Sequence, residues 1–220
     1  MKKGLTELVF ILDKSGSMSG LEGDTIGGYN SMLDKQKAVT GECQITTVLF
    51  DNNYELLHDR TDIRAVSPLT ENEYQVGGST ALLDAIGRTI NKIGNAQKHT
   101  ADDYRAEKVM LVIITDGEEN SSREYTAEKV KAQIERQKSK HGWEFIFLGA
   151  NIDSVEFAGR FGIDHSRAQN FYNDSAGVAL NYLEVSKAVA SFRAAPCGAP
   201  LAEDWNAEIE SDYKRREGRK

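Results

Sequence analysis

The sequence predicts an α/β protein with a doubly wound (Rossmann-like), mostly parallel central sheet that helices cover on both faces. Two observations indicate this class. Short apolar runs of strand length alternate with longer segments of helical period, which is the pattern of a parallel sheet packed between helices. The composition is that of a globular protein, because 40% of the 220 residues are hydrophobic and 28% are charged. We expect a sheet of about six strands.

The first part of the chain supplies three expected strands and one helix. Residues 5–12 form an apolar run that ends at an aspartate, which predicts the first strand. Residues 25–36 repeat apolar side chains at i, i+3 and i+4 and therefore predict a helix. A second apolar run covers residues 43–50. Residues 54–58 follow an Asp/Asn turn, so we expect an antiparallel strand at the sheet edge.

The middle of the chain continues the alternation. Residues 82–93 place Leu and Ile on one side of a predicted helix. Residues 109–115 are the most hydrophobic run and are expected in the centre of the sheet, where both faces are buried. Residues 126–140 predict a charged amphipathic helix that faces solvent, and residues 143–148 predict another strand.

The last part of the chain completes the sheet and then changes character. Residues 154–161, 168–172 and 175–192 are expected as helix, strand and helix. Beyond them, two prolines and a glycine are followed by a densely charged stretch. We therefore expect a folded domain over residues 1–193 and a charged C-terminal tail over residues 194–220, at most a frayed helix.

Charge and hydropathy exclude some partners. The 27 Lys and Arg against 34 Asp and Glu give a net charge of −7, which argues against general nucleic-acid binding. No apolar run has the length of a membrane span, and the N-terminal run lacks the uninterrupted apolar core of a signal peptide. Two distant cysteines, Cys43 and Cys197, fit a reducing compartment. We expect a cytoplasmic protein with no membrane contact.

Three polar motifs stand at the ends of predicted elements. Residues 13–17 and 115–117 lie at strand exits, and residues 78–80 lie just before a predicted helix. Loops of this kind gather at the carboxyl edge of a doubly wound sheet, so we expect their side chains to meet. The oxygen donors brought together are those of Asp13, Ser15, Ser17, Thr80 and Asp116. All are hard donors, which suit Mg²⁺ or Mn²⁺ and disfavour zinc or copper.

Each motif alone has a simpler interpretation. Ser and Asp after a strand often cap helices or form turns, and residues 78–80 could be the N-cap loop of the next helix. Asp84 is expected to support the site or to cap locally, and Glu118 and Glu119 to form a solvated charge run at its rim. The conjunction of the three motifs in order along an alternating α/β chain favours a metal site.

The motifs Phe10 to Met18, Gly78 to Ala85 and Ile113 to Glu118 resemble those of a von Willebrand factor type A (VWA) domain with a complete metal-ion-dependent adhesion site (MIDAS). The similarity covers about residues 5–193, and free-standing domains of this type resemble bacterial or phage-associated proteins. The resemblance implies a bound Mg²⁺, or Mn²⁺ or Ca²⁺. Its implied ligands are Asp13, Ser15, Ser17, Thr80 and Asp116.

The resemblance also implies a function. In such a domain the cation coordinates an Asp or Glu carboxylate of a partner protein, so the module mediates metal-dependent protein–protein interaction. The main alternative is an Mg²⁺-dependent phosphotransfer or phosphatase-type enzyme, because those enzymes also place aspartates at strand exits. They usually need a second carboxylate beside the first and a lysine for the phosphate, whereas position 15 is serine and Lys14 is expected to point away. We therefore expect no enzyme, and a static structural metal is the third hypothesis.

Overall fold

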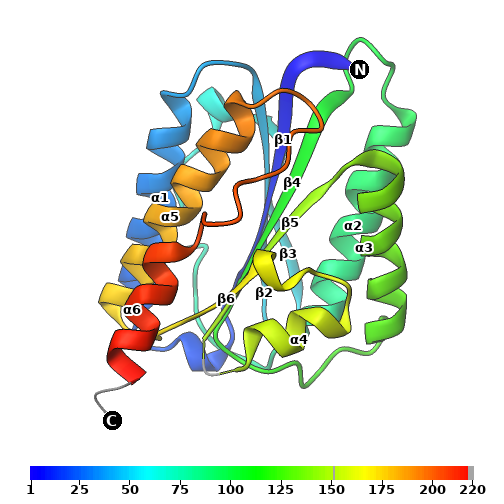
Figure 1. Ribbon diagram of the computed structural model, residues 1–220. Coiled ribbons are helices and arrows are strands. Elements are labelled where there is room, and N and C mark those ends of the chain that lie inside the picture. Colours follow the sequence, from blue (N-terminus) through cyan, green and yellow to red (C-terminus); the bar gives the residue numbers. More distant parts are fainter. Residues whose placement is uncertain (151, 218–220) are drawn as a thin grey trace.

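The computed structural model describes residues 1–150 and 152–217, and within them a six-stranded sheet lies between two layers of helices (Figure 1). The strands are β1 (Lys2–Asp13), β2 (Cys43–Phe50), β3 (Tyr54–Asp62), β4 (Ala106–Thr115), β5 (Glu144–Ala150) and β6 (Ala168–Phe171). Their order across the sheet is β3-β2-β1-β4-β5-β6. Every neighbouring pair is parallel except β2 with β3, which confirms the predicted antiparallel edge strand.

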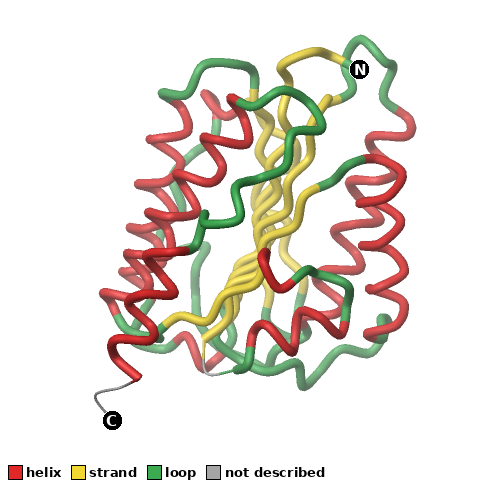
Figure 2. The backbone as a smooth tube through the Cα atoms, in the orientation of Figure 1, coloured by secondary structure: helices red, strands yellow, loops and turns green. Residues whose placement is uncertain are grey.

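Helices cover both faces of the sheet, as the alternation predicts. In the described residues they are α1 (Glu22–Lys37), α2 (Leu82–His99), α3 (Ala127–His141), α4 (Ser154–Arg160), α5 (Ser175–Ala194) and α6 (Ala207–Glu217). Figure 2 shows α1, α5 and α6 on one side of the strands and α2, α3 and α4 on the other. The doubly wound α/β class is therefore confirmed.

The central strands contain long apolar runs because both faces of these strands are buried. In β1, Leu8 and Phe10 pack into the core under α1 and α5, whereas Val9 and Ile11 pack into the core under α2 and α3. Successive side chains of a strand point to opposite faces, so each face of β1 supplies one core. The strand 109–115 was expected in the sheet centre, and β4 does lie there, beside β1.

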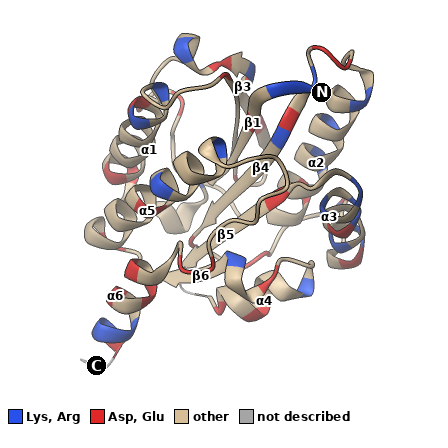
Figure 3. Ribbon diagram, turned by 45° about the horizontal axis from the view of Figure 1, so that its top comes forward, with Lys and Arg blue, Asp and Glu red and all other residues tan. Residues whose placement is uncertain are grey.

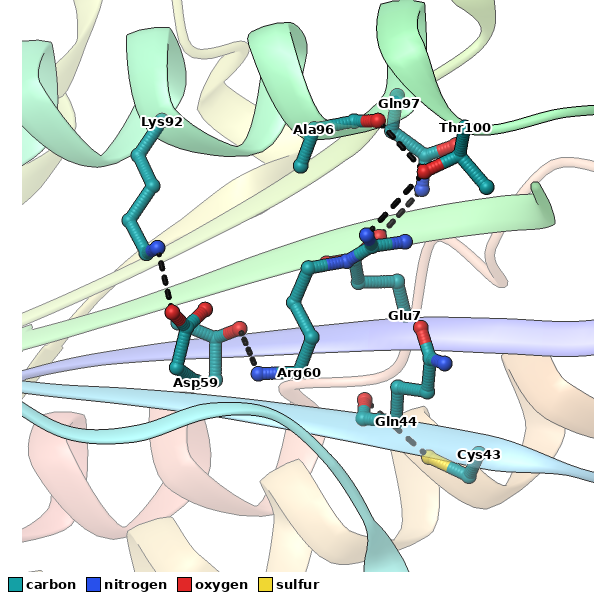
Figure 4. Close-up of polar contacts among 10 residues, drawn as sticks. Glu7, Cys43, Gln44, Asp59, Arg60, Lys92, Ala96, Gln97 and Thr100 are labelled. Atoms are coloured by element: carbon teal, nitrogen blue, oxygen red, sulfur yellow. Dashed lines mark hydrogen bonds and ion pairs between the residues drawn. The ribbon is translucent and has the colours of Figure 1, made fainter. Parts of the chain in front are cut away.

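The edge strand β3 extends beyond residues 54–58 and carries a bulge. Arg60 has a left-handed backbone with φ 50°, which is uncommon for a residue other than glycine. Its Nε donates to Glu7 Oε1 on β1 at 2.8 Å, and the side-chain amide of Gln97 on α2 donates to Glu7 Oε2 (Figure 4). Arg60 Nη1 also donates to Thr100 Oγ1 at 3.3 Å. The buried carboxylate of Glu7 thus joins β1, β3 and α2.

The C-terminal segment corrects a sequence expectation. Residues 194–220 were expected as a tail that is at most a frayed helix, yet residues 207–217 form α6, which packs against β6 and α5. Leu201, Trp205 and Ile209 are buried, and Trp205 Nε1 donates to the carbonyl of Ser166 at 2.7 Å. Three apolar side chains spaced four residues apart anchor a segment that is otherwise rich in charged residues. In residues 1–150 and 152–217, no helix combines the length and the apolar character that crossing a membrane needs.

Candidate metal centre

The first loop of the site begins where β1 ends. Asp13 is buried, and its Oδ1 accepts from the backbone N–H of Ser15 at 2.7 Å. Its Oδ2 accepts from the hydroxyl of Thr115, at the end of the neighbouring strand β4, at 2.5 Å. The Tyr74 hydroxyl donates to the backbone carbonyl of Asp13. Ser15 and Thr115 therefore hold the carboxylate of Asp13 at the carboxyl edge of the sheet, and Tyr74 holds its backbone.

The hydroxyls of the first loop reach the second aspartate. Ser15 Oγ and Ser17 Oγ lie 3.1 Å apart, and Ser17 Oγ donates to Asp116 Oδ1 at 2.6 Å. Asp116 follows β4 directly, and its Oδ2 accepts from Asn173 Nδ2 at 2.9 Å. Four of the five predicted ligands, Asp13, Ser15, Ser17 and Asp116, therefore form one hydrogen-bonded cluster.

Thr80 joins the cluster across Gly117. A methyl group at position 117 would lie 3.2 Å from Ser17 Oγ and 3.3 Å from Thr80 Oγ1, so both hydroxyls border the space over this glycine. The loops are also joined through their backbones, because Gly16 N donates to Gly78 O at 3.1 Å. The structure thus brings together all five side chains named from the sequence.

Further residues shape the loops without belonging to the donor set. Asp84 in the first turn of α2 accepts from three consecutive backbone N–H groups of residues 123–125 at 2.8 to 2.9 Å, so it holds the loop that precedes α3. Glu119 differs from the expected solvated charge run, because it accepts from the backbone N–H of Leu83 at 2.8 Å in the first turn of α2. Asn120 Oδ1 accepts from Thr80 N at 2.9 Å. Asn120 and Asn173 were not predicted, since an isolated asparagine in a loop has no distinguishing spacing.

Burial changes the electrostatics of both aspartates. It raises the pKa of Asp13 from 3.8 to about 6, although hydrogen bonds from Thr115 and Ser15 favour the charged form. Burial likewise raises the pKa of Asp116, against hydrogen bonds from Ser17 and Asn173. A buried carboxylate with a raised pKa favours a bound proton or a bound cation. The cluster is therefore electrostatically suited to a positive ion.

The donor chemistry fits a hard divalent cation. Two carboxylates and three hydroxyls are all oxygen donors, the type that Mg²⁺ and Mn²⁺ prefer. Across the described part of the chain, no three His, Cys, Asp or Glu side chains gather closely enough to form a metal cluster of their own. Among the five side chains named from the sequence, Asp13 and Asp116 carry the negative charge and the other three supply hydroxyls.

This doubly wound sheet with a polar cluster at its carboxyl edge has the fold of a VWA domain, as solved structures show. No protein-family model and no curated protein matches the sequence. The von Willebrand factor type A structure from Catenulispora acidiphila is 16% identical with a TM-score of 0.57, covering 84% of this chain and 42% of that one. Proximal thread matrix protein 1 from the mussel byssus, with a zinc-occupied MIDAS motif, is also 16% identical with a TM-score of 0.57, covering 85% of this chain and 46% of that one.

A third similar structure matches over almost its whole length. The vWF domain of the type V pili tip protein Mfa5 from Porphyromonas gingivalis is 12% identical with a TM-score of 0.60, and the match covers 87% of this chain and 97% of that domain. The chain spans less than half the length of the other two proteins. At these identities the likeness establishes the VWA fold.

Proposed function

We propose that the chain is a divalent-metal-dependent protein interaction module. Its cation would be held by the five side chains that meet at the carboxyl edge of the sheet, namely Asp13, Ser15, Ser17, Thr80 and Asp116. The observation that carries the proposal is the chain of hydrogen bonds from Ser15 through Ser17 to Asp116, beside the buried Asp13. The zinc-occupied MIDAS of the mussel protein supports a divalent cation in this fold.

The donor set explains why the module would recognise an acidic partner. Two aspartates can neutralise a divalent cation formally, but the three hydroxyls add no negative charge. A bound Mg²⁺, Mn²⁺ or Ca²⁺ would supply an electrophilic anchor for the carboxylate of a partner Asp or Glu. Because the chain carries a net charge of −7, recognition of an acidic group should depend on the metal. The cytoplasmic location and the free-standing bacterial or phage-associated type stay predictions.

The contacts of Lys14 favour this proposal over an enzyme. A phosphotransfer site would need a lysine whose ammonium group is free to contact phosphate. In this chain Lys14 Nζ pairs instead with Glu55 Oε2 on β3 at 2.7 Å. The side chain of Lys14 is only 12% exposed, although that of Glu55 is 45% exposed, so little of the lysine is accessible to a ligand. Position 15 supplies a hydroxyl rather than a second carboxylate beside Asp13. We therefore propose a binding role with no catalytic residue.

Mn²⁺ binding and partner capture test the proposal together. We expect the wild-type chain to bind Mn²⁺, as measured by electron paramagnetic resonance, and to capture a protein in Mg²⁺ but not in a chelator. Asp13→Ala should keep the fold and lose both properties. Glu118→Ala removes the same charge from an exposed neighbour of Asp116 and should keep both.

Three outcomes would overturn the proposal. A wild-type chain that binds neither Mn²⁺ nor Mg²⁺ has no such site. Partner capture that is equally strong in the chelator, or in Asp13→Ala, would mean that the metal does not mediate recognition. Turnover of a phosphoester that requires Asp13 would favour the enzyme.

A further inference from the structure

A short segment between β6 and α5 contacts a predicted metal ligand. Asn173 donates through Nδ2 to Asp116 Oδ2 at 2.9 Å, while Ser17 donates to Asp116 Oδ1 at 2.6 Å. The two contacts hold different oxygens of the same carboxylate. Asn173 is therefore placed to fix the rotation of Asp116 relative to the hydroxyls of the site.

The residues on both sides of Asn173 are held by the C-terminal helix. The rings of Tyr172 and Tyr213 lie with their centroids 4.9 Å apart and their planes at 31°. The guanidinium of Arg216 lies 5.3 Å from the centroid of the Tyr172 ring, and its Nη1 pairs with Asp174 Oδ2 at 2.6 Å. Figure 3 shows acidic and basic residues along the ribbon of α6, which lies next to β6. Tyr213 and Arg216 of α6 thus contact the residues that precede and follow Asn173.

The segment 172–174 has little room to move independently. Asp174 caps α5, because its Oδ1 accepts from Gly177 N at 2.8 Å, and its own N–H donates to the carbonyl of Tyr172 at 2.9 Å. A methyl group at position 177 would lie only 2.0 Å from the Tyr172 carbonyl oxygen. Because the turn is this tight, a shift of either flank must move Asn173 as well.

The N-terminal end of α6 is attached to the fold by a separate set of contacts. Ile209 and Trp205 are buried, and Asn206 Nδ2 donates to Gln169 Oε1 on β6 at 2.9 Å. Arg216 also pairs with Asp212 within the helix at 2.8 Å. The helix is therefore attached to the fold at its first turn, while its last turn contacts the segment beside the metal site.

We propose that α6 controls the cation affinity of the site by holding Asn173 against Asp116. This inference rests on the proposed function, since it takes the five-residue cluster to be a metal site. With α6 docked, Asn173 orients the carboxylate, and affinity is high; with its last turn released, Asn173 is loosened, and affinity falls. Linkage is reciprocal, so a bound cation should stabilise docking of α6 by the same factor.

Mn²⁺ affinity in matched variants tests this control. Loss of an outer contact to a ligand typically costs about 10- to 100-fold in metal affinity, which we expect for Asn173→Ala. Arg216→Ala acts through Asn173 and should cost at least about 5-fold. Lys214→Ala removes a neighbouring charge that is 70% exposed and pairs only within α6, with Glu210, among the contacts of the described residues, so it should leave the affinity unchanged.

A double variant separates positioning from general destabilisation. If Arg216 acts through Asn173, the combination of Asn173→Ala and Arg216→Ala should bind Mn²⁺ no more weakly than Asn173→Ala alone. Independent effects would multiply. Multiplied losses, or single variants with wild-type affinity, would overturn the control by α6 while leaving the metal site intact. A wild-type chain without Mn²⁺ affinity would overturn the proposed function itself.

Hydrogen exchange in the wild-type chain provides a second measurement that needs no variant. Saturating Mn²⁺ should slow amide exchange in the last turn of α6 by at least the factor by which Arg216→Ala weakens Mn²⁺ binding. If Arg216→Ala does not fold, this measurement decides alone. Equal exchange of the α6 amides with and without Mn²⁺, in a chain that binds Mn²⁺, would refute the proposal.

Discussion

Substituting Arg60→Met would leave the carboxylate of Glu7 buried without its charged partner. Glu7 is 0% exposed, and the side chain of Arg60 is 21% exposed, so the pair lies at the edge of the interior. The amide of Gln97 would still donate to Glu7, but an amide carries no charge. Methionine keeps the length of the side chain and the same Cβ, so the strained backbone at position 60 contributes equally to both proteins.

The expected loss follows from the burial of the pair. Removing one partner of a buried ion pair costs about 3 to 5 kcal/mol, and the partial exposure of Arg60 places this pair near 3 kcal/mol. For a chain of this size, each kcal/mol lowers the melting temperature by about 2 to 4 °C, so we expect a decrease of about 6 to 12 °C. The nearby pair of Lys92 on α2 with Asp59 on β3 has the same kind of short contact, at 2.7 Å, but is 30% and 50% exposed. Lys92→Met should cost less than about 1 kcal/mol.

The loss should also depend on pH. Burial raises the pKa of Glu7 above 4.5, and Arg60 opposes that effect, so Arg60→Met should raise the pKa further. A carboxyl with a raised pKa in the folded state binds its proton more tightly when folded than when unfolded. Its contribution to stability is therefore present below about pH 4.5 and is lost as the pH rises through the folded pKa. The deficit of Arg60→Met should be larger at pH 8 than at pH 5.

Urea denaturation at the two pH values measures both effects. Trp143 and Trp205 are buried, so their fluorescence reports unfolding of the chain. A loss below 1 kcal/mol at pH 8, or a loss that is equal at pH 5 and pH 8, would refute the reasoning. A loss for Lys92→Met as large as that for Arg60→Met would show that burial is not what distinguishes the two pairs.

Two further predictions concern the site and the helix packing. Because burial raises the pKa of Asp13 to about 6, protons compete with the cation below that pH, and Mn²⁺ affinity should rise from pH 5 to pH 7 and then level off. Equilibrium titration checks this, and an affinity independent of pH would contradict it. Gly28→Ala should cost about 1 to 3 kcal/mol in urea denaturation, because its Cβ would lie 2.3 Å from Tyr182 Cδ2 on α5. Gly27→Ala on the same helix meets no heavy atom within 4 Å and should gain about 0.5 to 1 kcal/mol, so equal losses in both variants would contradict the packing argument.

Most of the fold could be predicted because local periodicity reports burial. Residues 8–12 of β1 and 109–114 of β4 are apolar at every position, which a strand needs only when both faces are covered. The five side chains that meet at this edge could also be named from the sequence, because three of them alternate in a single loop and Asp116 directly follows the most hydrophobic strand. Where strand order and strand ends are predictable, so is the set of side chains that meets at the carboxyl edge.

The parts that could not be predicted depend on tertiary contacts. At the bulge, Arg60 contacts the buried carboxylate of Glu7, which lies more than fifty positions earlier in the chain. Nothing in the local sequence of β3 indicates this contact. The packing of α6 could not be predicted either, because most of its residues are charged. Its anchoring residues, Trp205 and Ile209, are few, and their burial depends on β6 and α5, against which α6 packs.

The same distinction separates what the site would bind from how its affinity would be set. The proposed donor set is encoded in short motifs, which lie where β1 and β4 end and just before α2 begins. The orientation of Asp116 instead depends on Asn173, and the position of Asn173 depends on the last turn of α6. Contacts of this second kind can change without altering a single ligand. Two chains with identical motifs should therefore differ in cation affinity when only one of them carries a docked C-terminal helix.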